Sequence, residues 1–420
     1  MEKTAYRITR LSNGLRIVTE YVPGVRSVTV GIWIRTGSRH EPEERAGIAH
    51  LLEHMAFKGT ETRSARELAE IVDGVGGHIN AYTSKEDTSY YIKVLDEHFP
   101  LAVEILADML LRSRFDAGEL EKEKRVILEE IKMYEDTPED LVQDLLTETL
   151  WAGHPLGRPV IGWERTVSAV DREALVDFWR RHYEPSRTVV AVAGNITHER
   201  VVEEVSRWFG GWTGGADPAP AEAPAPRPAE AWRRKAIEQV HLCVGAPAAR
   251  YGADELYAEL ILTNILGGSS SSRLFQVVRE EHGLAYSVYT FHGAYSDAGM
   301  FGIYAATSPE TAARVLDLIA RECARVRREG VTAEELARTR DQFKANLLLA
   351  LESTSSRMNR LGRTLLMLGR VVPVEEVVAR VEAVDRDQLA EAAERLLDPA
   401  RWALAGAGPA EPLRLREVVG

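Results

Sequence analysis

Residues 169–175 read AVDREAL, and residues 383–389 read AVDRDQL, 214 positions further along the chain. The same offset relates EPSR at 184–187 to DPAR at 398–401, and an apolar run follows each tetrapeptide. Solenoid repeats have periods of about 20–50 residues, so this much longer period indicates a duplicated domain. A chain of 420 residues has room for two such domains.

A segment rich in proline and alanine separates the two repeats. Its centre, ADPAPAEAPAPRP at 216–228, favours an extended polyproline II conformation and cannot enter the core of a sheet or a helix. We therefore predict an N-terminal domain at 1–215, a linker at 216–231 and a homologous C-terminal domain at 232–420.

Strand and helix patterns alternate within the first half. Residues 28–34 alternate apolar side chains with Thr29, Gly31 and Trp33, which is the period of a half-buried strand. We expect an α+β fold of two homologous domains, each a mixed sheet with helices packed on it. Other patterns predict helices at 46–57, 65–72, 100–111 and 117–134 and a pair of strands at 78–83 and 88–94.

The composition excludes several classes of protein. The formal net charge of −12 disfavours nucleic acid as a partner. Two cysteines, Cys243 and Cys323, cannot form a disulfide framework. No run of about 18 apolar residues occurs, so we expect no membrane span. The N-terminus shows no apolar stretch of a secretory signal, and we therefore expect a cytoplasmic protein.

One pentapeptide, HLLEH at 50–54, indicates metal chemistry. His50 and His54 are four residues apart and therefore share one face of a helix. H-x-x-E-H is the inverzincin signature, in which zinc lowers the pKa of a water molecule and the carboxylate, here Glu53, accepts its proton. The alternative is a surface helix with two solvated histidines, which the apolar neighbours of the motif disfavour.

A two-histidine zinc site needs a third protein ligand. A charged helical run at 119–130 offers several carboxylates. Glu123 and Glu130 are seven residues apart and share a helix face. The spacing alone does not choose between Glu129 and Glu130, and a solvated charged helix is the other interpretation of this run.

The block GIAHLLEHMAFKGT at 47–60 resembles the active-site block of the pitrilysin-type zinc peptidases, a family that includes insulin-degrading enzyme and the mitochondrial processing peptidase. The resemblance extends over nearly the whole chain. It implies zinc as the cofactor and Glu130, 76 residues beyond His54, as the third ligand. It further implies that Glu123 supports catalysis.

A second block, GHINAYT at 77–83, is similar to the exposed edge strand that holds substrate in this family. An edge strand pairs with the backbone of any extended peptide, whatever its side chains. The resemblance thus implies that Asn80, Ala81 and Tyr82 bind substrate. An ordinary buried strand is the alternative.

In the second half, Arg279 and Tyr286 match a pair that reaches toward the substrate and the tetrahedral intermediate in the family. Both side chains can donate hydrogen bonds to a developing oxyanion. A salt bridge and a core tyrosine are the alternative explanation of these residues.

The second half carries no metal ligands at the repeated positions, where Leu262, Leu266 and Asn346 stand. One active site per chain follows. Larger relatives close a chamber with four such domains, so the resemblance implies a homodimer of two chains facing each other like a clamshell. Arg279 and Tyr286 would then complete the site of the partner chain.

The sequence therefore predicts a zinc metalloendopeptidase that hydrolyses unfolded peptides or extended segments. One alternative is a selective processing peptidase that removes N-terminal extensions. Another is a non-catalytic structural subunit of the same family, although such relatives usually have degraded ligands. A third possibility is an enzyme that works only with a separate partner subunit.

Overall fold

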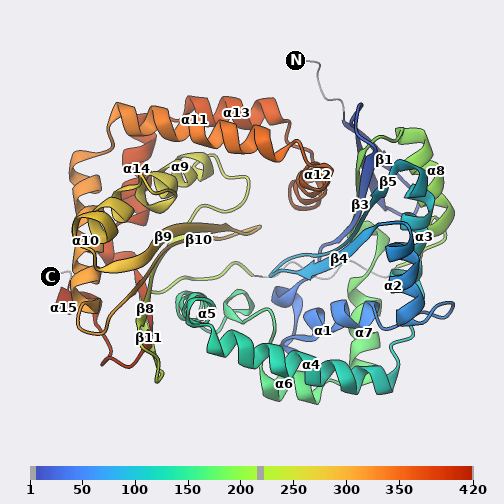
Figure 1. Cartoon of the computed structure of the whole chain (residues 1–420), viewed down its shortest axis with the longest axis horizontal. Helices are drawn as coiled ribbons and strands as arrows, with labels where there is room; N and C mark the ends of the chain where they lie inside the picture. Colours follow the sequence, from blue (N-terminus) through green and yellow to red (C-terminus); the bar gives the residue numbers. More distant parts are fainter. Residues whose placement is uncertain (1–5, 215–221, 419–420) are drawn as a thin grey trace. The chain divides into compact units, whose positions relative to one another are not determined.

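The computed structural model describes residues 6–214 and 222–418 (Figure 1). Its contacts divide the chain into two compact units, each of which combines segments from both halves of the sequence. Unit 1 consists of Met1–Ile131, Pro159–Ala221 and Leu348–Val372, and unit 2 consists of Lys132–Arg158, Glu222–Leu347 and Pro373–Gly420.

Unit 1 is built on a six-stranded mixed sheet with the order β1-β2-β6-β3-β5-β4. β2 and β6 are parallel, and the other neighbours are antiparallel. β4 lies at one edge of the sheet, where it pairs with β5. The strands are β1 (Tyr6–Arg10), β2 (Arg16–Tyr21), β3 (Ser27–Ile34), β4 (His78–Thr83), β5 (Thr88–Leu95) and β6 (Thr188–Gly194).

Helices cover both faces of this sheet. On one face, Val28, Val30 and Ile32 of β3 share a core with α1, α3 and α8. On the other face, Met358 and Leu361 of α12 pack against β2, β3 and β6. The helices are α1 (Ile48–Ala56), α2 (Ala65–Gly74), α3 (Phe99–Leu111), α4 (Ala117–Asp136, which continues into unit 2), α6 (Glu164–Ala169), α7 (Arg172–His182), α8 (His198–Phe209) and α12 (Thr354–Leu368).

The predicted elements of the first half are confirmed, with ends that shift by one or two residues. The strand predicted at 28–34 is β3, but it is not half-buried. Thr29 and Trp33 are as buried as their apolar neighbours because α12 covers their face. The Thr29 and Thr354 hydroxyls lie 2.9 Å apart, and Trp33 Nε1 donates to Met358 Sδ at 3.2 Å.

Unit 2 repeats this architecture on a five-stranded mixed sheet of order β7-β11-β8-β10-β9. β7 and β11 are parallel, as β2 and β6 are in unit 1. The strands are β7 (Glu230–Arg234), β8 (Val240–Ala248), β9 (Ala285–Ala294), β10 (Gly299–Thr307) and β11 (Ala403–Gly408).

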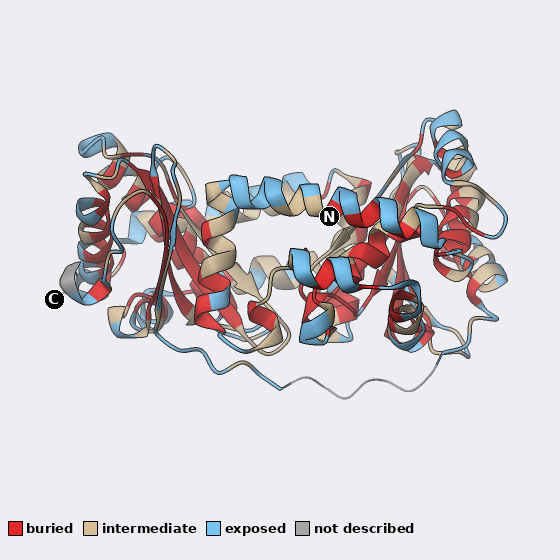
Figure 2. Ribbon diagram, turned by 90° about the horizontal axis from the view of Figure 1, so that it is seen from below, coloured by how far each residue is buried: buried red, intermediate tan, exposed pale blue. Residues whose placement is uncertain are grey.

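Helices cover both faces of the second sheet as well. α9, α10 and α14 share a core with one face, and α5 packs on the other through Val142, Leu146 and Leu150. Figure 2 shows the central strands of each unit buried, whereas the helices around them carry exposed surface. The helices are α5 (Pro138–Leu150), α9 (Leu256–Gly267), α10 (Ala312–Glu329), α11 (Ala333–Ala350, whose end belongs to unit 1), α13 (Val374–Ala383), α14 (Arg386–Leu396) and α15 (Leu415–Val418).

Five strands have the same order in both sheets, since β2-β6-β3-β5-β4 of unit 1 correspond to β7-β11-β8-β10-β9 of unit 2. This common order confirms the predicted duplication and the predicted fold class. The predicted boundaries, 1–215 and 232–420, differ from the compact units because α5 and α12 are exchanged. A sequence repeat marks the order of the duplicated segments, whereas a helix belongs to the sheet on which it packs. Within the predicted linker, residues 216–221 lie outside the described residues, and the last two positions already belong to β7.

No helix within residues 6–214 and 222–418 combines the length and the apolarity that crossing a bilayer requires.

Candidate active site

The helix α1 presents the two predicted histidines on its polar side. Gly47 precedes the helix in a left-handed conformation, with φ of 94°. The buried carboxylate of Glu41 then accepts hydrogen bonds from the N–H groups of Gly47 and Ala49, at 2.8 and 2.7 Å. This cap fixes the start of the helix. His50 and His54 are one turn apart on this helix and therefore project together, with ring centroids 4.7 Å apart.

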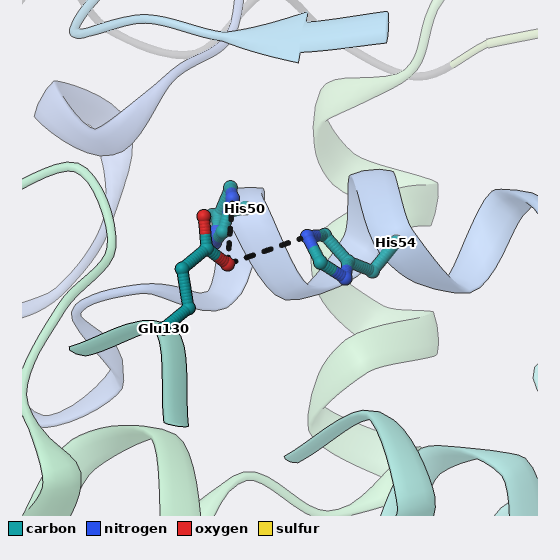
Figure 3. A group of neighbouring side chains, drawn as sticks. All are labelled: His50, His54 and Glu130. Carbon is teal, nitrogen blue, oxygen red and sulfur yellow. Dashed lines mark ion pairs between the residues drawn. The ribbon is translucent and has the colours of Figure 1, made fainter. Parts of the chain in front are cut away.

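Glu130 approaches both imidazoles from α4 (Figure 3). Its Oε2 lies 3.9 Å from His50 Nε2 and 3.8 Å from His54 Nε2. Among the described residues, these three form the one group of three or more His, Cys, Asp or Glu residues whose ligand atoms all lie within 4.8 Å of one another. Two imidazole nitrogens and one carboxylate oxygen are the donor set of a catalytic zinc site.

The charge state of His50 suits a metal ligand. Burial, and to a smaller extent the neighbouring His54, lower the pKa of His50 to about 4. The imidazole is therefore neutral at pH 7, which is the form that binds a metal ion.

Glu123 lies behind His54. Its Oε2 is 3.1 Å from His54 Nδ1, and its Oε1 is 2.6 Å from the ammonium of Lys58. A carboxylate that accepts the Nδ1–H of a histidine directs the other ring nitrogen, Nε2, toward the ligand group. The structure thus gives Glu123 a geometric means of supporting the site.

Glu53 lies on α1 beside the histidines, with its side chain largely buried. Its Oε2 accepts a hydrogen bond of 2.6 Å from the hydroxyl of Thr83 at the end of β4. Burial raises the pKa of Glu53, and nearby Glu130 adds to this, while the hydrogen bond from Thr83 and the proximity of His54 oppose it. A carboxyl group with a raised pKa is suited to accept and return a proton.

The strand predicted to hold substrate is the edge strand β4. Asn80 is exposed, and Ala81 and Tyr82 are partly exposed. The backbone N–H of Ala81 donates to the Asn80 side chain at 2.8 Å rather than to a neighbouring strand. The ring of Tyr82 packs edge-on to Trp33, on the α12 side of the sheet, while Thr83 faces α1. The exposed edge is confirmed; substrate binding stays a prediction.

Arg279 and Tyr286 are brought together within unit 2. Arg279 lies on a π-helix, Phe275–Glu281, with its guanidinium carbon 4.5 Å from the ring centroid of Tyr286 and 4.7 Å from that of Phe275. It also donates to the carbonyl oxygen of Tyr286 at 2.8 Å. Tyr286 is 78% exposed and is therefore not a core tyrosine. The predicted action of the pair on substrate stays a prediction.

Two residues of the site were not predicted from the sequence. Lys58 lies four residues beyond His54, just after the helix, where a lysine usually indicates a favourable interaction with the helix end. Thr83 lies on the same face of β4 as Ile79 and Ala81, which pack against the core that contains α1, so the two-residue period of the strand could have placed it on that face.

Comparisons with known proteins identify the family. The model described as insulinase, peptidase family M16, matches residues 16–164, and the model described as peptidase M16 inactive domain matches residues 169–343. The chain belongs to peptidase family M16. The first match contains the histidine and glutamate group, and the second contains Arg279 and Tyr286. The predicted resemblance is thereby confirmed.

The relatives of this M16 chain bear names that refer to zinc and proteolysis. This chain is 46% identical over 377 residues to the uncharacterized zinc protease YmxG of Bacillus subtilis, and the match covers 90% of this chain and 92% of the relative. It is 41% identical over 426 residues to an uncharacterized zinc protease of Mycobacterium bovis, covering 99% and 97%.

Two solved structures share the fold. A protease from Helicobacter pylori matches with a TM-score of 0.92 at 22% identity, covering 97% of this chain and all of that one. A peptidase M16 inactive domain from Pseudomonas fluorescens matches with a TM-score of 0.90 at 19% identity, covering 98% of this chain and all of that one. At these identities the matches show the two-domain M16 fold.

Proposed function

We propose that this M16 chain is a zinc-dependent endopeptidase that hydrolyses peptide bonds in unfolded peptides or extended segments. The observation that carries the proposal is the convergence of His50, His54 and Glu130 beside the buried carboxylate of Glu53. Family membership and the names of the relatives support it.

In this proposal His50, His54 and Glu130 hold the zinc ion, and Glu123 orients His54. Bound zinc supplies a Lewis acid, which lowers the pKa of water and polarises a carbonyl group. With three protein ligands, a bound ion would keep a coordination position open for water or substrate.

Glu53 is the general base in this proposal. It accepts the proton of the attacking water and returns it to the leaving amine. The hydroxyl of Thr83 holds Oε2 of Glu53, which fixes the plane of the carboxylate while Oε1 remains available for the proton. Because Thr83 ends the edge strand, the same contact connects the base to the proposed substrate-binding strand.

The edge strand supports an endopeptidase with low sequence preference. A peptide that adds a strand beside β4 is held through its backbone, so its side chains and its termini matter little. The substrate carbonyl would replace the Asn80 amide at the N–H of Ala81. Because the added strand must be extended, the proposed substrates are unfolded peptides or extended segments.

We further propose that the working form is a homodimer in which the partner's copies of Arg279 and Tyr286 contact the substrate. The exposed Tyr286 hydroxyl and the neighbouring guanidinium of Arg279 can stabilise a developing oxyanion.

Cleavage of an internally quenched, unstructured peptide tests the proposed function. We expect cleavage at internal bonds, loss of activity after chelation and recovery with added zinc. Persistent cleavage by the zinc-free protein, removal of terminal residues only, or no cleavage of any extended peptide would contradict the proposal. A peptide set with and without N-terminal extensions of known precursors separates general degradation from selective processing.

A further inference from the structure

We propose that Lys58 is a positioning residue that determines how firmly the metal ion is retained, acting through Glu123 and His54. This inference rests on the proposed function, because it assumes that His54 is a zinc ligand. Lys58 pairs with Glu123 and supplies no atom to the ligand group itself.

A continuous chain of contacts leads from Lys58 to the ligand group. The Lys58 ammonium lies 2.6 Å from Glu123 Oε1. The other oxygen of the same carboxylate, Oε2, lies 3.1 Å from His54 Nδ1. His54 Nε2 in turn faces Glu130 Oε2 at 3.8 Å. A displacement of Glu123 would therefore rotate the His54 ring.

Burial makes this ion pair different from an ordinary surface pair. Exposed ion pairs contribute little to stability because water solvates both partners. Here the side chain of Glu123 is only 6% exposed, while that of Lys58 is 30% exposed. A buried carboxylate needs a countercharge or several hydrogen bonds to remain in place. Lys58 supplies that charge and keeps the carboxylate between itself and His54.

The position of Lys58 in the chain also favours this role. It follows the end of α1, and its N–H donates to the carbonyl oxygen of Met55 at 3.1 Å, which holds it in the final turn. From there its side chain reaches α4. Since α1 carries His50 and His54 and α4 carries Glu130, the ion pair joins the two helices that supply the ligands.

A lysine that only neutralised the partial negative charge at the end of α1 would not need a defined partner. The interaction with a helix terminus requires charge alone and no defined partner on another helix. The 2.6 Å contact between Lys58 and Glu123 has a defined geometry, and it shares its carboxylate with a ligand histidine. Outer contacts of this kind typically change metal affinity or activity about 10- to 100-fold when they are removed.

The rate of zinc loss from the holoenzyme to an excess of chelator tests the inference without depending on peptidase activity. We expect Lys58→Met to lose zinc about 10- to 100-fold faster than the wild type. Lys58→Arg, which keeps the charge and the donors, should stay within a few-fold of the wild type. Lys122→Met is the matched control, because Lys122 pairs with Glu119 at 2.6 Å on the same α4 but is 60% exposed.

A double-mutant cycle separates this role from a merely structural one. If Lys58 acts through Glu123, then Lys58→Met should accelerate zinc loss little further in a Glu123→Gln background. Melting temperatures of all variants with saturating zinc report on folding separately. Equal zinc loss from Lys58→Met and wild type, or fully additive effects in the cycle, would overturn the inference alone. A wild-type chain that holds no zinc would overturn the proposed function and this inference with it.

Discussion

Glu129 and Glu130 are neighbours on α4, but their side chains point about 100° apart around the helix axis. Glu130 Oε2 reaches both histidines, whereas Glu129 is exposed. We therefore expect Glu130→Gln to reduce bound zinc strongly and Glu129→Gln to retain it. Metal analysis of the two purified variants checks this, and equal zinc contents would exclude Glu130 as a ligand.

Thr83 offers a second test at the scale of single residues. Thr83→Val removes the hydroxyl that donates to Glu53 but leaves the shape of the side chain nearly unchanged. We expect kcat to fall roughly 10- to 100-fold, because the base is no longer held in one orientation. KM and zinc content should change little, and Thr83→Ser should recover most of the rate. A loss that appears only in KM would assign Thr83 to substrate binding instead.

The residues of the site could be predicted to different degrees. His50, His54 and Glu53 follow from helical spacing within one pentapeptide, a short-range relation. Glu130 is remote in sequence, and only the family resemblance distinguished it from Glu129. Lys58 was not predicted because its partner, Glu123, lies on another helix.

At the scale of elements, the start of α11 shows how one carboxylate can secure a helix. Thr332 N–H donates to Glu335 Oε2 at 2.8 Å, and Glu335 N–H donates back to the Thr332 hydroxyl at 3.1 Å. Arg273 also donates to both oxygens of Glu335, each at 2.7 Å. Burial alone would raise the pKa of Glu335, but the hydrogen bonds from Arg273 and Thr332 lower it to about 2.

This pKa predicts a pH-dependent contribution to stability. Because folding lowers the pKa of Glu335 below its ordinary value of 4.5, the carboxylate stabilises the fold above that pH and loses this effect as the pH falls toward 2. We expect Glu335→Gln to lower the free energy of unfolding by about 2 kcal/mol at pH 7. Urea denaturation of both proteins should show the difference shrinking below about pH 4.5. A difference that grows in acid would contradict this explanation.

Elements were predicted well where they depend on neighbouring residues and poorly where they depend on residues remote in sequence. Helix and strand ends in the first half are correct to one or two residues. The half-buried character of β3 was wrong because α12, more than 300 residues away in sequence, covers the face that carries Thr29 and Trp33. Alternation reports the polarity of a strand's own side chains and not what later packs on them.

At the scale of the whole molecule, the two units exchange helices. α5 from the first half covers the sheet of unit 2, and α12 from the second half covers the sheet of unit 1. The sequence repeat predicted the duplication but not this exchange, because both helices lie outside the matching heptapeptides and tetrapeptides.

The exchange predicts that neither half of the chain is stable alone. A fragment of residues 1–221 lacks α12, which leaves Trp33 and the apolar face of β6 uncovered. We expect this fragment to aggregate or to bind a hydrophobic dye such as ANS, and co-expression with residues 222–420 to yield a soluble complex. Cooperative unfolding of the isolated fragment without dye binding would show that α12 is dispensable.

Zinc content and peptide cleavage, measured on the same samples of wild type and Glu53→Gln, test the proposed role of Glu53 most sharply, with the exposed Glu44→Gln as the control. We expect Glu53→Gln to retain one zinc ion per chain and to cleave at least about 100-fold more slowly, because the metal ligands remain and the base is lost. Glu44→Gln should match the wild type in both measurements. Cleavage by Glu53→Gln at the wild-type rate would show that Glu53 is not the general base.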